Sequence, residues 1–481
     1  MAAAATVMKR ELGSSEENWT RCTAGGTGIG IFGMALRQIV QTPSILLAAK
    51  AVCENHSMLR AQLVPDAKSS SKKLAFEVRS VDSFAPVVES LPWPEEGTLG
   101  SCDGDEEALV KSALQAVVTN ELNLPFHKEH KELDHTVDIF QIHVYEEASS
   151  GSSIIVLRFH SGACDRYSSS TAAQEFVAAL DRCVEAGVEC ERQEQQRQDR
   201  DGLLPCMEDL VPKSKASKGF FKKGIDAVGY ALNSSKSALL PFQPGFTKQP
   251  HATPFRSEIL SYSLGKPGTE DFFAACKRES TTIAAALSAA FLKIAASVTK
   301  EKKQDTFSFT NVLDCRGYFE PPLDASVVGN YSAGLPHDEQ VKESVPFWDL
   351  ARQISSSTEK NLAKSRHFSE LSVLNMLLSQ VIKHPSVTPS SSMRTALFTV
   401  FVDGPTKCSW GNVKNLKLAG TIGPLASMHY VGPCFSVAEA LLDGPELSLT
   451  FVYTTPMYSR SQLQDLVSSS LDLLKSAVAS N

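Results

Sequence analysis

A histidine ends an apolar run near the middle of the first half of this sequence, and an acid follows five residues later. The stretch reads Ile154-Ile-Val-Leu-Arg-Phe-His160-Ser161-Gly-Ala-Cys-Asp165-Arg166-Tyr-Ser168. Residues 153–159 are apolar after Ser153 except at Arg158, which predicts a strand covered on both faces. One His and one Asp are by themselves a weak signal, because a hydrogen-bonded histidine at a strand end is the ordinary case.

Helices and strands alternate on both sides of this stretch. Apolar spacing predicts four helices, over Ser44 to Asn55, Thr171 to Glu185, Thr281 to Ser297 and Ser459 to Ser480. The last begins with Ser459-Arg-Ser-Gln462, a capping box. Alternating apolar residues predict strands over 307–313 and 447–453. Strands separated by helices indicate an α/β fold.

Composition excludes several classes of protein. A chain of 481 residues with 42% hydrophobic content can bury a large core. Its net charge is −7, and the acidic and basic residues are mixed along the chain. The sequence therefore lacks the basic face of a nucleic-acid binder. No apolar run reaches the roughly 18 residues of a transmembrane helix. Eleven cysteines stand singly, which predicts free thiols in a reducing compartment, and the acidic start lacks the features of a signal or transit peptide. We therefore expect a cytoplasmic protein.

One polar stretch divides the chain. It opens at Glu191 with a run of charged and amide side chains and continues through several prolines and lysines, as a solvated linker does. We therefore expect an irregular N-terminal segment over 1–40, one lobe over 41–190, a crossover linker over 191–224 and a second lobe over 225–481.

Two other patterns favour ordinary explanations. Gly28-Ile-Gly30-Ile-Phe-Gly33 matches the dinucleotide-binding string, but no buried strand is predicted before it and the next acid, Glu54, is too distant. We interpret it as a flexible glycine-rich segment. Histidines at 127, 130 and 135 lie among acids in a polar stretch, which favours a solvated loop over a metal site.

The central stretch resembles the His-His-x-x-x-Asp-Gly-x-Ser signature of condensation domains and alcohol acyltransferases. Aligned without a gap, His160 takes the first His, Ser161 the second, Asp165 the Asp, Arg166 the Gly and Ser168 the Ser. Four further stretches are similar to family segments in the same order, namely 46–60, 204–212, 276–290 and the Asp-x-Arg…Pro-Pro-Leu…Gly-Asn run over 311–330. Together they cover residues from about 45 to 475.

The resemblance implies two chloramphenicol-acetyltransferase-like α/β lobes with mixed sheets and an active-site tunnel between them. It implies acyl transfer from a thioester, on coenzyme A or a carrier protein, to a hydroxyl or amine acceptor. In active members the second His is the general base. The Asp is structural and pairs with the Arg of the Asp-x-Arg run, here Asp165 and Arg316, and Asn330 is expected to line the tunnel.

The chain departs from the family at the catalytic position. Ser161 cannot act as a base without a partner, so His160 and Ser161 are the candidate catalytic residues, with His160 as the base or as the activator of a Ser161 nucleophile. Arg166 adds bulk and charge beside them. Three readings stay open: an acyltransferase, a catalytically degenerate protein that binds an acyl thioester, a metabolite or a partner protein, and an inactive structural subunit.

The implied partners are small molecules. We expect acyl-CoA as co-substrate, a small-molecule donor and acceptor, no tightly bound cofactor and no metal. We also expect no nucleic acid, no transmembrane segment and a monomer.

Overall fold

The computed structural model describes most of the chain. The described residues are 8–24, 26–65, 73–95, 106–126, 136–186, 203–212, 215, 237–246, 254–299, 305–371, 373–375, 394–400, 413–429, 435–442 and 446–480. The histidines at 127, 130 and 135 and most of the predicted linker lie outside them.

The chain forms two compact units. Unit 1 comprises Met1–Leu210, Pro321–Tyr331 and Cys408–Ala426, and unit 2 comprises Val211–Glu320, Ser332–Lys407 and Ser427–Asn481. The first division falls inside the predicted linker, but two later segments belong to unit 1, so the units are not simply successive. The expected tunnel depends on how the lobes are placed and stays a prediction.

Unit 1 contains a five-stranded sheet in the order β13-β2-β8-β7-β5. The strands are β13 (Leu418–Ala426), β2 (Ile29–Leu36), β8 (Ser152–His160), β7 (Phe140–Glu147) and β5 (Val87–Leu91). Only the β5–β7 pair among them is parallel. All nine residues of β8 are buried, as predicted for a strand covered on both faces.

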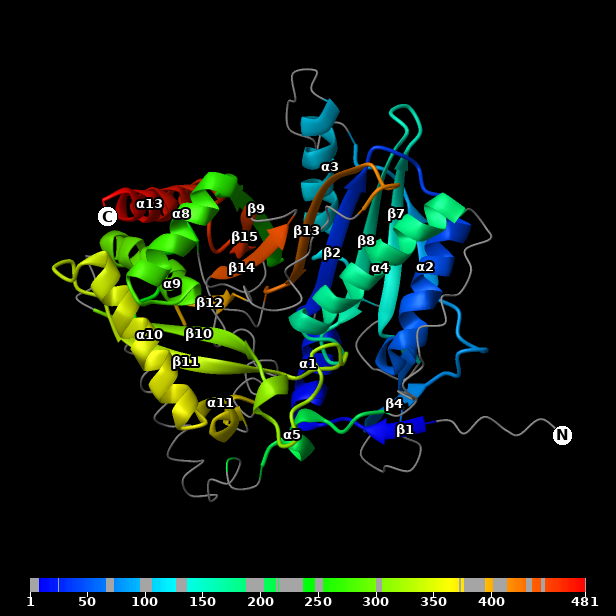
Figure 1. Cartoon of the computed structure of the whole chain (residues 1–481), viewed down its shortest axis with the longest axis horizontal. Coiled ribbons are helices and arrows are strands. Elements are labelled where there is room, and N and C mark those ends of the chain that lie inside the picture. Colours follow the sequence, from blue (N-terminus) through cyan, green and yellow to red (C-terminus); the bar gives the residue numbers. More distant parts are fainter. Residues whose placement is uncertain are drawn as a thin grey trace. The chain divides into compact units, whose positions relative to one another are not determined.

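Helices cover the two faces of this sheet (Figure 1). The helices of unit 1 are α1 (Ser14–Ala24), α2 (Thr42–Asn55), α3 (Glu106–Glu121), α4 (Arg166–Ala186) and α5 (Met207–Leu210), with a 3₁₀ turn η1 at Ser57–Arg60. Within β2, Gly33 faces Leu114 and Val118 of α3, whereas Gly30 faces Ser169 of α4. Because residues three apart on a strand point to opposite sides, α3 and α4 lie on opposite faces.

A second, smaller sheet belongs to the same unit. Its order is β1-β4-β3-β6, and every pair is antiparallel. The strands are β1 (Met8–Glu11), β4 (Leu74–Val78), β3 (Ala61–Pro65) and β6 (Val137–Asp138).

Unit 2 is built on a six-stranded mixed sheet in the order β11-β10-β12-β14-β15-β9. The strands are β11 (Ser332–Gln340), β10 (Thr306–Asp314), β12 (Ala396–Thr399), β14 (Phe435–Leu442), β15 (Glu446–Thr455) and β9 (Arg256–Ser263). The helices are α8 (Gly265–Arg278), α9 (Ile283–Val298), α10 (Phe347–Ala363), α11 (Arg366–Ser369) and α13 (Arg460–Ala479), with a 3₁₀ turn η5 at Arg316–Tyr318.

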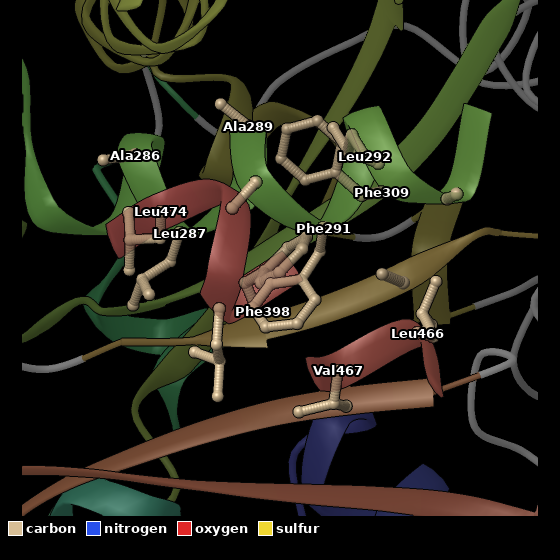
Figure 2. Close-up of a cluster of buried hydrophobic side chains, with 14 of the residues drawn as sticks. Ala286, Leu287, Ala289, Phe291, Leu292, Phe309, Phe398, Leu466, Val467 and Leu474 are labelled. Carbon is tan, nitrogen blue, oxygen red and sulfur yellow. The ribbon is translucent and has the colours of Figure 1, made fainter. Parts of the chain in front are cut away.

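The core of unit 2 surrounds α9. Alanines let neighbouring elements approach this helix, and Phe291 packs against Phe398 and Phe451 with ring centroids 6.3 and 5.1 Å apart. Figure 2 shows Leu287 of α9 next to Leu474 of α13, and Leu466 and Val467 of α13 belong to the same buried cluster. The hydroxyl of Ser459 accepts a hydrogen bond from the Gln462 amide at 3.2 Å, which confirms one half of the predicted capping box.

The expectation of an irregular segment over 1–40 is wrong for most of that range. Residues 8–36 form β1, α1 and β2, and every residue of β2 is buried. Residues 29–33 are therefore strand rather than flexible loop, and Gly28 directly precedes the strand. Its glycines have a packing role, described below.

Among the described residues, no single helix is both long enough and apolar enough to cross a membrane. The helices α8 and α9 pass that test only as a pair, and they are bent by 99° at the break between them.

Candidate functional site

The predicted site residues of the N-terminal half lie together where β8 ends. The ladder between β2 and β8 ends with Ile29 opposite His160. The chain then turns, and the carbonyl of His160 accepts hydrogen bonds from the amides of Ala163 and Cys164 at 2.8 and 2.9 Å. We call residues 160–168 the motif loop. They comprise the last residue of β8, the turn after it and the start of α4.

His160 is fully buried inside this loop. Its Nδ1 accepts the amide hydrogen of Gly162 at 3.1 Å, so that nitrogen carries no proton. The ring packs edge-on against Phe126, with centroids 5.4 Å apart. The hydrogen bond from Gly162 and the contact with Phe126 hold the turn.

Ser161 has a different environment. Its side chain is partly exposed, its amide donates to the carbonyl of Gly28 at 3.2 Å, and its carbonyl accepts from Asn330 Nδ2 at 2.9 Å. Among the described residues, none forms a hydrogen bond with the Ser161 hydroxyl. The structure thus brings His160, Ser161 and Asn330 together, without a Ser161–His160 hydrogen bond.

Asp165 caps α4 and fastens a second loop. Its Oδ1 accepts from the amide of Ser168 at 2.7 Å, the geometry of a helix N-cap. Its Oδ2 accepts from the amide of Tyr331 at 2.8 Å, and its own amide donates to the carbonyl of Gly329 at 3.1 Å. The Ser168 hydroxyl donates to that carbonyl at 2.7 Å and accepts from the Gly329 amide at 2.9 Å. The segment at residues 329–331 is therefore hydrogen-bonded to the motif loop.

Arg316 belongs to unit 2, where it is buried and pairs with Asp314 at 2.6 Å. The expected pair between Asp165 and Arg316 would join residues of the two units, and it stays a prediction.

A helix that sequence reasoning missed packs against the motif loop. A Cβ added to Gly162 would lie 2.7 Å from Thr20 Oγ1 and 3.0 Å from the carbonyl of Glu16, both in α1. A Cβ added to Gly28 would lie 2.8 Å from the indole of Trp19 and 3.5 Å from Ser161 Cβ. The signals that predict α1 are the acids Glu16 and Glu17 in its first turn and Arg21 in its last.

These contacts explain the Gly28-x-Gly30-x-x-Gly33 string. Gly28 has a left-handed φ of +78° and meets the indole of Trp19. Gly33 lies so close to α3 that a Cβ would meet Val118 at 2.6 Å. The glycines of the string therefore allow close packing of helices on β2, and the dinucleotide reading has no support.

A buried charged cluster supports the other side of His160. Arg158 pairs with Glu121 of α3 at 3.1 Å and donates to the carbonyls of Leu124 and Pro125 at 3.1 and 3.0 Å. Burial opposes ionisation of Glu121, but the hydrogen bond from His143 and the charge of Arg158 outweigh it and lower its pKa. The Arg158 guanidinium also lies 5.4 Å from the Phe126 ring, so the cluster fixes the residue against which His160 packs.

Two side chains of α4 form hydrogen bonds with β13 and with the residues just before it. The carboxylate of Asp181 accepts from three successive amides, Lys414, Asn415 and Leu416, with shortest distances of 3.1, 2.7 and 2.9 Å. Arg166, the departure from the family's glycine, donates from Nε to the carbonyl of Pro424 at 2.8 Å. Its guanidinium is therefore directed at β13.

Within the described parts of the chain, no group of three or more His, Cys, Asp or Glu side chains could hold a metal ion. The seven described cysteines are free and buried.

Comparison of the sequence with protein-family models and with curated proteins finds no match. Comparison of the structure does. The chain is similar to trichothecene 15-O-acetyltransferase from Fusarium sporotrichioides, with a TM-score of 0.71 and 11% identity over 99% of this chain and 97% of that one.

Two further solved structures carry other activities on the same fold. One is the starter condensation domain of rhizomide synthetase in complex with C8-CoA and Leu-SNAC, with a TM-score of 0.60 and 12% identity over 98% and 95% of the chains. The other is the epimerization domain of tyrocidine synthetase B, with a TM-score of 0.60 and 13% identity over 100% and 98%.

The likeness confirms the predicted fold. The chain has the α/β fold of the condensation-domain and acetyltransferase structures, known as the chloramphenicol-acetyltransferase-like fold. Identities of 11 to 13% carry the fold alone, and the three neighbours differ in their reactions. Function must therefore be argued from the site.

Proposed function

We propose that this protein binds an acyl thioester and transfers its acyl group to a hydroxyl or amine acceptor. The observation that carries the proposal is the hydrogen-bonded structure of the motif loop. Asp165 caps α4 and also accepts a hydrogen bond from the backbone amide of Tyr331 in the Gly329–Tyr331 segment. Ser161 is partly exposed at the end of β8. A neighbour with the same fold is an acetyltransferase, and another was solved with C8-CoA.

In this reaction the thioester C–S bond breaks, a C–O or C–N bond forms, and the acceptor's proton leaves with the thiol. The Ser161 hydroxyl can donate a hydrogen bond to the thioester carbonyl, where negative charge develops. It cannot take up a proton near neutral pH. Catalysis would therefore rest mainly on holding donor and acceptor in reactive geometry.

The sequence predicts His160 as the base or as the activator of Ser161, whereas in this proposal His160 holds the turn that carries Ser161. Its Nδ1 is occupied by the Gly162 amide and its ring is fully buried. A direct role as general base would require that hydrogen bond to break. Acyl-CoA is the proposed donor, and the free thiols fit a reducing, cytoplasmic setting.

A second candidate is binding of an acyl thioester without turnover. The burial of His160 favours this candidate, because a buried His160 is not available to accept a proton from the acceptor.

Purified protein and a panel of acyl-CoA donors with alcohol and amine acceptors would test both candidates. Release of free thiol that depends on acceptor supports transfer. Binding measured by calorimetry without thiol release supports the second candidate. Neither binding nor release with any donor would overturn both. The Ser161→His variant, which restores the family's residue, gives the sharpest comparison.

A further inference from the structure

The helix α1 is held in place by directed polar contacts. Its buried residues are almost all polar, namely Ser15, Glu16, Asn18, Thr20 and Thr23, together with Cys22. The Glu16 carboxylate pairs with Arg10 at 2.8 Å and accepts from the amide of Gly13 at 2.7 Å, while the Ser15 amide donates to Glu208 of α5 at 2.7 Å. Hydrogen bonds of this kind fix both the position and the rotation of a helix.

Trp19 differs from the other residues of this helix. It is a large aromatic residue on a polar helix, and its side chain stays partly exposed while Asn18 and Thr20 on either side are buried. The residue is intermediate in exposure, so part of the indole stays accessible although its neighbours in α1 are buried.

The indole lies beside Ser161. Trp19 Cε3 and Ser161 Cβ both lie within 3.5 Å of the point where a Cβ on Gly28 would stand. Gly28 has a left-handed φ of +78°, and its lack of a side chain leaves room for the ring. Figure 1 shows α1 near the start of β2, which Gly28 directly precedes in sequence.

We propose that Trp19 forms an apolar wall of the thioester site next to Ser161 and determines which acyl chains the site accepts. This inference rests on the proposed function. An acyl group whose carbonyl is placed at Ser161 would run along the indole, which offers a rigid, largely apolar surface. The ligand class is therefore a thioester with an apolar acyl chain.

Calorimetric titration with CoA, acetyl-CoA and octanoyl-CoA tests the proposal. We expect Trp19→Ala to weaken octanoyl-CoA binding about tenfold, because several methylene groups lose their apolar contact. Acetyl-CoA and CoA should change less than about twofold, since a single methyl group, or none, offers the indole little apolar area. Trp93→Ala is the matched control. Trp93 is also partly exposed in unit 1, but it follows β5 at the far edge of the sheet, and its loss should leave all three affinities unchanged.

Fluorescence gives a second measurement that does not depend on a truncated side chain. Octanoyl-CoA should change the tryptophan emission of the unmodified protein, and Trp19→Phe should abolish that change while calorimetry still detects binding. This variant decides the matter if Trp19→Ala fails to fold.

The outcomes separate the two proposals. No binding of any thioester to the unmodified protein overturns the proposed function. Binding of octanoyl-CoA that is the same in Trp19→Ala, or an emission change that persists in Trp19→Phe, overturns the role of Trp19 alone. If Trp19→Ala changes only the KM of the acceptor, the role of Trp19 is also overturned, because the indole would then contact the acceptor and not the acyl chain.

Discussion

At the end of β8, the His160 ring accepts a hydrogen bond from the Gly162 amide and packs against Phe126. Replacement by Ala removes the ring from a fully buried position and leaves the Gly162 amide without this acceptor. We expect His160→Ala to lower the free energy of unfolding by about 2–4 kcal/mol. Chemical denaturation measures the loss. His160→Asn is the matched control, since its Oδ1 can replace Nδ1, and it should recover part of the stability. An Ala variant as stable as the unmodified protein would contradict the structural role.

Gly162 tests the contact with α1. A Cβ there would lie 2.7 Å from Thr20 Oγ1 and 2.9 Å from His160 Cε1. Because both neighbours are buried, we expect Gly162→Ala to cost about 1–3 kcal/mol of unfolding free energy through overpacking. Gly317→Ala is the control, because a Cβ at that position meets nothing within 4 Å. Equal stabilities of the two variants would show that α1 does not press on the motif loop.

At the scale of elements, β13 depends on Asp181. Three successive backbone amides donate to this carboxylate where the segment joins unit 1. In Asp181→Ala these amides lose their acceptor, and we expect faster hydrogen exchange at 414–416 and along β13, with about 1–3 kcal/mol less stability. Asp181→Asn keeps one oxygen acceptor, so its stability and exchange rates should lie between those of Asp181→Ala and the unmodified protein. Unchanged exchange at 414–416 would contradict the proposed fastening.

Sequence patterns predicted the elements whose burial follows a simple period. The helices α2, α4, α9 and α13 and the strands β10 and β15 carry apolar residues at helical or strand spacing, whereas residues 154–159 of β8 form an apolar run broken only by Arg158. The helix α1 has no apolar stripe, because its buried face is polar. It was missed for that physical reason, although the charges at its two ends are a helix signal. The strand β2 was missed because glycines break up its apolar residues.

The site was predictable only in part. The motif loop and the residues His160, Ser161 and Asp165 follow from one local stretch of sequence. The role of Trp19 does not, because it depends on a helix that packs by hydrogen bonds. The hydrogen bonds from Gly329, Asn330 and Tyr331 join segments more than 150 residues apart in sequence, and only the family resemblance indicated Gly329 and Asn330 in advance.

At the scale of the whole molecule, the described residues of unit 2 include three buried histidines with depressed pKa values. Burial lowers the pKa of His337, His367 and His429 to about 4 in each case. Positive neighbours reinforce the shift, for example Lys215 beside His367 and Arg256 beside His429. All three histidines are therefore neutral in the folded protein at neutral pH.

These shifts predict that unit 2 becomes less stable in mild acid. An unfolded histidine, with a pKa of about 6.5, binds a proton below that pH, whereas each folded one does so only near pH 4. The unfolded state therefore binds more protons between pH 6.5 and 4, and stability must fall as the pH is lowered through this window. His367 packs between Tyr318 and Phe368, so His367→Phe should fit the same space. We expect this variant to reduce the slope of unfolding free energy against pH by about 1.4 kcal/mol per pH unit near pH 5. Denaturant titrations at a series of pH values measure the slope, and an unchanged slope would mean that His367 is already protonated in the folded protein at that pH.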